Sequence, residues 1–69
     1  MNTVKQILNF IIKEKAQGNV FQEMNIQMKI MMKGINVKGI IEERIPDHPE
    51  LIEKLEKIAK EFEVDLKKM

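Results

Sequence analysis

The ionisable side chains with the clearest chemical potential lie close together at positions 47 to 50. Asp47, His48 and Glu50 flank Pro49, and carboxylates beside an imidazole can support acid–base catalysis or hold a metal ion. The same residues match the start of a helix, with an acidic cap, a proline in the first turn and a glutamate after it. Because the cap accounts for both carboxylates, we expect His48 to be a solvated residue of that turn without a catalytic role.

The residue types that nucleophilic catalysis and cofactor binding need are largely missing from the chain. Cysteine and serine are absent, Thr3 is the single threonine, and His48 is the only histidine. These absences exclude thiolate metal sites and any Ser-His-Asp or Cys-His arrangement. Gly34 and Gly39 have the spacing of a phosphate-binding loop, but its Lys-Ser/Thr ending does not follow. We therefore predict that the chain is not an enzyme and has no cofactor and no metal site.

The length of the chain determines the domain organisation that we expect. Its 69 residues allow one small domain over positions 1 to 69, since domains commonly contain about 100–150 residues. A fold of this size buries only about 60% of the surface of its unfolded chain, so disulfides, a metal or a partner subunit usually add stability. Without cysteine, self-association is the remaining source of buried area, and we expect a homodimer.

Charge and hydropathy give an expectation about location. Lys plus Arg number 12 and Asp plus Glu number 11, for a net charge of +1, so only a local cluster of charge could steer a charged partner. The apolar residues at positions 7 to 12 are interrupted by Asn9 and followed by Lys13 and Glu14, unlike the continuous run of a signal peptide. No stretch has the roughly 20 apolar residues of a membrane span, so we expect a cytoplasmic protein without membrane contact.

Two segments have the apolar periodicity of helices. In the first, apolar residues recur every three or four positions at Val4, Ile7, Leu8, Ile11 and Ile12. This spacing predicts a helix from Val4 to Gln17, which Gly18 would end in a left-handed conformation. A second apolar stripe consists of Leu51, Ile52, Leu55, Ile58, Ala59, Phe62 and Leu66. It predicts a helix from His48 to about Glu63.

The segment between these helices has a different pattern, in which apolar and polar residues alternate. A first run has apolar side chains at every second position, Met24, Ile26, Met28, Ile30 and Met32. A second run has Ile35, Val37, Gly39, Ile41 and Ile45. A period of two is typical of a half-buried strand, so the sequence predicts strands over residues 24–33 and 36–45. A turn at Gly34 would join them as a β-hairpin.

An alternative interpretation places the same segment in a helix. One stripe of that helix would hold Phe21, Met24, Met28, Met31, Met32 and Ile35, and Met, Gln and Lys favour helices. Ile26 and Ile30 would then lie about 140–180° away from the stripe, which favours strands. We therefore predict an α+β fold with the order αββα, in which both helices cover one face of the hairpin. The alternative is an all-α fold of three to four helices.

The outer face of the predicted hairpin is rich in basic and amide side chains. Its basic residues are Lys29, Lys33, Lys38 and Arg44, and its amides are Asn25, Gln27 and Asn36. Lysines can contact phosphates and amides can contact base edges, so nucleic-acid binding is one hypothesis. Lysines on exposed strands also protect their edges from aggregation, and no aromatic residue for base stacking lies among them.

Three apolar residues are predicted to lie outside the core. Met31 and Ile40 would lie on the outer face of the hairpin, and Phe10 lies off the apolar stripe of its helix. The methionines of the first strand could form an adaptable binding surface, but all except Met31 follow the inward pattern and are interpreted as core. We predict protein-interface residues at Phe10, Met31 and Ile40, in a non-enzymatic binding or regulatory module that acts as a homo-oligomer through protein–protein contacts. The alternative is a nucleic-acid-binding protein.

Overall fold

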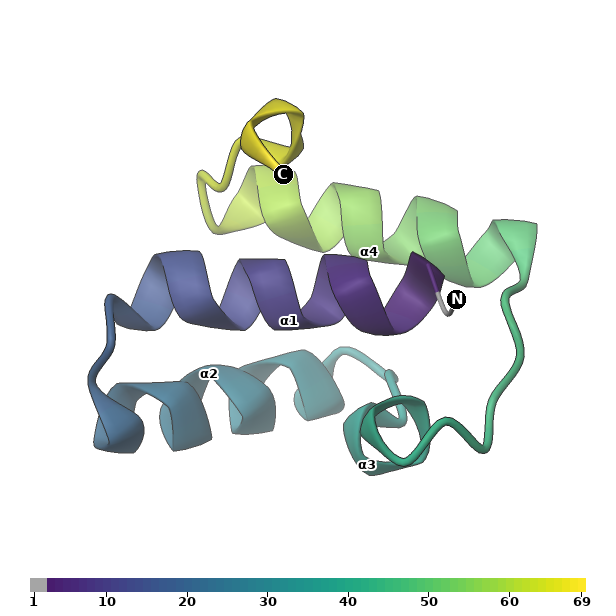
Figure 1. The fold of residues 1–69 in the computed structure, drawn as a ribbon, viewed down its shortest axis with the longest axis horizontal. Coiled ribbons are helices and arrows are strands. Elements are labelled where there is room, and N and C mark those ends of the chain that lie inside the picture. The colour runs from purple at the N-terminus through teal and green to yellow at the C-terminus, as the bar shows by residue number, and fades with distance from the viewer. Residues whose placement is uncertain (1–2) are drawn as a thin grey trace.

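The computed structural model describes residues 3–69, and every regular element in that range is helical (Figure 1). The chain forms α1 (Thr3–Ala16), α2 (Val20–Met32), α3 (Val37–Ile41), α4 (Pro49–Glu61) and the short 3-10 helix η1 (Leu66–Lys68). A helix that could span a bilayer, which needs about 20 apolar residues, is not found between residues 3 and 69.

α1 lies at the centre of the molecule, with α2 along one side and α4 along the other (Figure 1). α2 runs antiparallel to α1, α4 runs parallel to it, and α3 lies near the beginning of α1. One core joins all four helices and the turn between α2 and α3; it consists of Val4, Ile7, Leu8, Ile11, Ile12, Ile26, Ile30, Ile35, Val37, Ile40, Leu55, Ile58 and Ala59. α1 supplies five of these residues, so both neighbouring helices depend on it for their buried contacts.

The first predicted helix, from Val4 to Gln17, is found as α1. Its apolar stripe is the buried side, as the spacing of three and four residues requires. The helix ends where Gln17 and Gly18 adopt positive φ angles of 51° and 82°. That left-handed conformation turns the chain back toward α1, and glycine adopts it without the penalty that a Cβ would bring.

The predicted β-hairpin is wrong, because residues 24–33 and 36–45 contain no strand. The α+β fold of order αββα is therefore replaced by the all-α alternative. Two positions along a helix turn by about 200°, so every second residue falls on nearly opposite sides. Ile26 and Ile30 face the core with 3% and 0% exposure, whereas Met24 and Met28 face solvent. The alternating pattern belongs to a helix that is apolar on two sides.

A turn with Gly34 at a positive φ of 91° connects α2 to α3. Asn36 begins α3, since its Oδ1 accepts a hydrogen bond from the backbone N–H of Gly39 at 3.0 Å. Gly39 is buried, and a Cβ there would lie 2.7 Å from Asn36 Nδ2 and 2.8 Å from Ile45 Cδ1. Glycine at this position therefore lets the capping side chain and the following loop approach the backbone of α3.

The second predicted helix, from His48 to Glu63, is found as α4, and the two residues before it begin two different helices. His48 begins α4, since its Nδ1 accepts a hydrogen bond from the N–H of Glu50 at 3.3 Å. Asp47, which was expected to cap this helix, accepts hydrogen bonds from the backbone N–H groups of Val4 and Thr3 at 3.0 and 3.1 Å. The bond from Val4, followed by that from Thr3, lowers the pKa of Asp47. Asp47 thus ties the loop before α4 to the start of α1.

Candidate functional site

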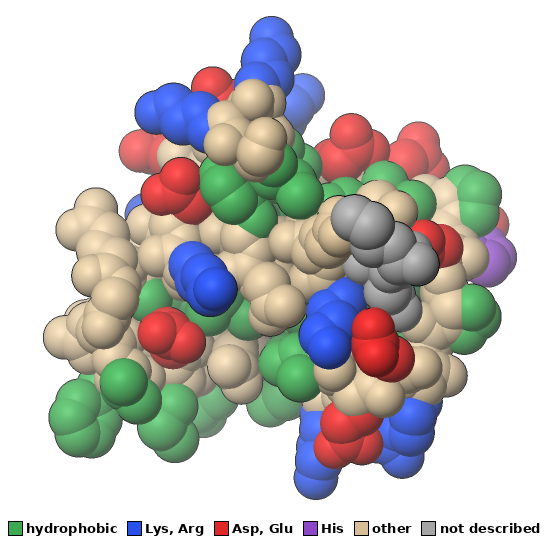
Figure 2. Space-filling model, viewed as in Figure 1, with side chains coloured by type: hydrophobic (Ala, Val, Ile, Leu, Met, Phe, Trp, Pro, Cys, Tyr) green, Lys and Arg blue, Asp and Glu red, His purple; other side chains and the backbone are tan. Residues whose placement is uncertain are grey.

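The outer side of α2 carries a group of exposed apolar side chains that we call the α2 face. Its six members are Val20, Phe21, Met24, Met28, Met31 and Met32. Their exposed fractions range from 48% to 85%. Figure 2 shows hydrophobic side chains projecting at the lower left, where α2 lies in Figure 1. Exposed apolar patches of this extent mark interaction sites in globular proteins.

The position of these residues around the helix explains why they form one surface. At about 100° per residue, the six side chains fall within an arc of about 120°. No charged residue of α2 lies in that arc, and Glu23 and Lys29 lie on its two flanks. Ile26 and Ile30 lie on the opposite side and are buried. Within residues 3–69, only this inner side of α2 is covered by other parts of the chain.

A local cap lies at the start of α2, and a contact with α4 lies just after its end. Asn19 caps the start, since its Oδ1 accepts a hydrogen bond from the backbone N–H of Gln22 at 3.1 Å. Just after the helix, Lys33 forms an ion pair with Glu61 of α4, and its Nζ lies 6.0 Å from the centre of the Phe62 ring. That distance permits a cation–π interaction. The buried inner side and these contacts position α2 so that its other side faces outward.

The three predicted interface residues lie in different environments. Met31 belongs to the α2 face. Phe10 is half-buried on α1, where it lines a shallow depression with Met69. Ile40 is 0% exposed in the core, so its predicted place on an outer surface is wrong. The strand interpretation assigned Ile40 outward, whereas the turn of α3 directs it toward α1 and α2.

The four basic residues of the nucleic-acid hypothesis do not share a sheet face, because that sheet does not form. Lys29 is exposed on a flank of α2, and Lys38 is exposed on α3. Lys33 is paired with the acidic residue of α4 described above, and Arg44 Nε lies 3.0 Å from Glu42 Oε1. Two of the four cations therefore have acidic partners in their own chain. Nucleic-acid binding stays a prediction, without the common surface that suggested it.

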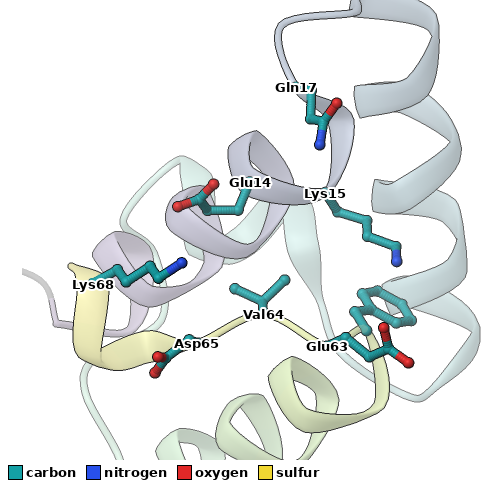
Figure 3. A pocket seen from close by; sticks show the side chains of 8 residues that line it. Glu14, Lys15, Gln17, Glu63, Val64, Asp65 and Lys68 are labelled. Atoms are coloured by element: carbon teal, nitrogen blue, oxygen red, sulfur yellow. The ribbon is translucent and has the colours of Figure 1, made fainter.

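A second candidate site is a hollow of about 430 Å³ between the end of α1 and the segment that joins α4 to η1 (Figure 3). Val64 points toward its centre, and the charged residues around it are Glu14, Lys15, Glu63, Asp65 and Lys68. All five charged side chains are exposed, and Asp65 Oδ1 accepts the backbone N–H of Lys67 at 2.9 Å. Ligand pockets are mostly apolar and bury most of the ligand. The hollow is lined mostly by exposed charged side chains, so it resembles a ligand pocket poorly. The α2 face is the stronger candidate site.

Five members of the α2 face were missed as surface residues, namely Val20, Phe21, Met24, Met28 and Met32. Four of the five, all except Val20, belong to the helical stripe of the alternative interpretation. The helix was not preferred because Ile26 and Ile30 would lie on its other side, away from that stripe. A helix with two apolar sides satisfies both observations, since the isoleucines fill the core and the methionines face outward.

Within residues 3–69, no three His, Asp or Glu side chains gather closely enough to hold a metal ion. Comparison of the chain with protein-family models, with curated proteins and with solved structures finds no significant match. The α2 face is therefore the feature from which a function is inferred.

Proposed function

We propose that this protein is a non-enzymatic binding or regulatory module that acts as a homo-oligomer through protein–protein contacts, with the α2 face as the contact surface. The observation that carries the proposal is the exposure of six apolar side chains on one side of a helix whose other side is buried. Removing apolar surface from water contributes about 25 cal/mol per Å². A second protein surface over the α2 face would supply that contribution.

The residue types of the α2 face support a protein partner. Four of the six residues are methionine and one is phenylalanine, and the centres of protein interfaces are enriched in aromatic residues and methionine and depleted of charge. Flexible thioether side chains adapt to the shape of an opposing surface. Phe21, which is 79% exposed, supplies the kind of aromatic anchor that dominates binding energy in many interfaces.

The size of the domain supports self-association in particular. A core in a chain of fewer than about 70–80 residues supplies only about 3–5 kcal/mol of stability. The chain has no cysteine for disulfides, and burial against a second copy would supply further stabilisation. Binding that is restricted to the folded state raises stability in proportion to the logarithm of partner concentration.

The test is sedimentation equilibrium of the unmodified chain and of two variants with the same change in charge. Met28→Lys places an ammonium group in the middle of the α2 face, and lysine is a good helix former. Gln22→Lys adds the same charge at an exposed position of α2 outside the arc of the face. We expect the unmodified chain and the Gln22→Lys variant to associate at micromolar concentration, and the Met28→Lys variant to be a folded monomer.

Circular dichroism establishes that each variant keeps its helices, so that loss of association is not loss of folding. Equal association of the Met28→Lys variant and the unmodified chain would remove the α2 face from the interface. A monomeric unmodified chain at concentrations up to hundreds of micromolar would contradict the proposed homo-oligomer itself.

A further inference from the structure

The spacing of the α2 face along the chain is the same when it is read in either direction. The steps between its six members are 1, 3, 4, 3 and 1 residues. Residue 26 is the midpoint, and positions at equal distance from it form the pairs Val20 with Met32, Phe21 with Met31, and Met24 with Met28. A second copy of α2 that runs in the opposite direction therefore places an apolar residue at the level of every apolar residue. Two-fold interfaces require self-complementarity of this kind.

The angular positions of the paired residues also suit an antiparallel pair. At about 100° per residue, the two members of each pair lie on opposite sides of the centre line of the face. Each member is about 20° from that line for Met24 and Met28, about 40° for Phe21 and Met31, and about 60° for Val20 and Met32. Met24 of one copy would lie beside Met28 of the partner subunit, and the two side chains would not meet end to end. The same holds for Phe21 and Met31. Each layer of the pair is thus filled by one side chain from each copy.

A parallel arrangement is less favourable than an antiparallel one. In a parallel pair each residue meets its own counterpart, so any spacing would match itself and a palindromic spacing would have no consequence. An antiparallel pair also opposes the two helix dipoles, whereas a parallel pair aligns them. A face of about 120° centred opposite one residue has this spacing in any helix, so the spacing is compatible with an antiparallel pair, and the opposed dipoles are what favour that pair over a parallel one.

The extent of the α2 face agrees with the area that a stable dimer needs. A fully exposed Phe or Met side chain presents roughly 200 Å², so six residues with exposures of 48–85% present about 700 Å² on each copy. Two copies would bury up to about 1,400 Å², and specific stable interfaces bury about 1,200–2,000 Å² in total.

The charges of the chain oppose this contact only weakly. The net charge is +1, so two copies repel one another weakly. In an antiparallel pair each flank meets the same flank of the other copy, which places Lys29 near Asn25 of the partner subunit. The two Lys29 side chains on one flank, and the two Glu23 side chains on the other, would each lie about six residues apart along the helix, or roughly 9 Å at 1.5 Å per residue, a distance at which salt of about 0.15 M screens exposed charges. The amide can accept a hydrogen bond from the ammonium group.

From these observations we infer that the partner of the α2 face is the α2 face of a second copy of this chain, held antiparallel about a two-fold axis near residue 26. The inference rests on the proposed function, which requires a homo-oligomer but does not specify how its copies are arranged. It gives a closed dimer, because an isologous contact uses the face of both copies and leaves none exposed for a third.

Disulfide trapping tests the arrangement, because the chain has no cysteine of its own. Phe21→Cys and Met31→Cys variants are prepared separately and oxidised alone and as a mixture, at a concentration where sedimentation shows a dimer. In the antiparallel pair these two positions are adjacent, while identical positions are ten residues apart, or about 15 Å. A disulfide needs Cα atoms within about 7 Å of one another. We expect the mixture to form the mixed disulfide, identified by mass, at least tenfold above either self-disulfide.

Each other outcome overturns the inference in a distinguishable way. Self-disulfides of each variant, without the mixed disulfide when the two variants are combined, would show a parallel pair. No disulfide in a dimeric sample would place the contact elsewhere on the molecule, although the homo-oligomer would remain. A monomeric unmodified chain would overturn the proposed function as well, and would leave the α2 face to a helix of another protein.

Two further mixtures protect the experiment from misleading results. If Phe21→Cys prevents association, the pair Val20→Cys with Met32→Cys retains the aromatic anchor and has the same expected pattern. A mixture of Gln22→Cys with Met31→Cys is the matched control, because Gln22 lies outside the arc of the face. We expect that control to give less than a tenth of the mixed disulfide of the test pair.

Discussion

α2 and α4 both contain 13 residues and lie on either side of α1, but they distribute their apolar residues differently. α4 buries Leu55, Ile58 and Ala59 on one side and exposes charged residues on the other. α2 buries Ile26 and Ile30 and exposes a second apolar set. Folding of the single chain accounts for the whole pattern of α4 but for only half of that of α2. The unexplained half is the α2 face, for which we propose a role in protein contacts.

The largest expected effect contrasts the two sides of α2. Ile30→Asp would bury an unpaired carboxylate in the core, at a cost comparable with the roughly 3–5 kcal/mol of stability expected for such a domain. We expect this variant to lose its helical circular dichroism signal at 25 °C. Met28→Asp places the same side chain on the exposed side, and we expect it to keep its helices. A folded Ile30→Asp variant or an unfolded Met28→Asp variant would contradict the assignment of the two sides.

The helices that bury one side were predictable from the sequence. Their stripes at three-residue and four-residue steps have one interpretation, and the predicted boundaries differ from those of α1 and α4 by one or two residues. Gly18 and Pro49 gave local signals for a helix end and a helix start. These features depend on neighbours within about one turn, which the sequence contains directly.

α2 was not predictable in the same way, because its pattern reflects two different environments. Met24, Ile26, Met28 and Ile30 alternate as a strand would, although they occupy opposite sides of a helix. The interpretation that all of them belong to one core produced the hairpin, and with it the basic outer face. An apolar residue that is exposed on a helix cannot be distinguished in the sequence from one that is buried in the core.

Long-range capping was also outside the reach of local patterns. Asp47 was expected to cap the helix that begins two residues later, yet it caps α1 across more than 40 positions of the chain. Asp47 can cap α1 because the fold brings the loop before α4 to the start of α1.

Met31 was the one member of the α2 face that the sequence analysis placed at the surface.

The second largest effect contrasts α4 with the outer side of α2. Leu55 is 0% exposed, and we expect Leu55→Ala to lower the free energy of unfolding by about 2–5 kcal/mol, as large-to-small changes in cores do. Met24 is 59% exposed, and we expect Met24→Ala to change the stability of the monomer by less than about 0.5 kcal/mol. Urea unfolding at a concentration below that of association measures both. Equal losses in the two variants would show that Met24 is packed within its own chain.

A smaller effect concerns the loop that leads into α4. The folded state lowers the pKa of Asp47, so its contribution to stability is present above the unfolded pKa of about 3.9 and is lost as the pH falls through the lower folded value. We expect Asp47→Ala to lower the melting temperature by a few degrees at pH 7, with a difference from the unmodified chain that shrinks below about pH 4. Asp47→Asn, which keeps an acceptor oxygen without the charge, should fall between the two.

The smallest effect concerns the link between α2 and α4. Lys33 joins the end of α2 to Glu61 and the Phe62 ring of α4, but both partners of the ion pair are partly exposed. Exposed pairs contribute about 0–1 kcal/mol. We expect Lys33→Met, which keeps the length of the side chain, to lower stability by no more than about 1 kcal/mol, with a smaller loss at high salt. A larger loss would indicate that this contact determines the position of α2.

The α2 face is tested most directly by NMR of the chain labelled with ¹³C at its methionine methyl groups, over a dilution series. Met24, Met28, Met31 and Met32 report on the face, and Met69, which is 54% exposed near the end of η1, is an internal control. We predict that the four resonances from α2 change together with one midpoint as the protein is diluted, while that of Met69 stays constant. Four α2 resonances that do not change with concentration, or a change at Met69 alone, would contradict the assignment of the α2 face as the contact between copies.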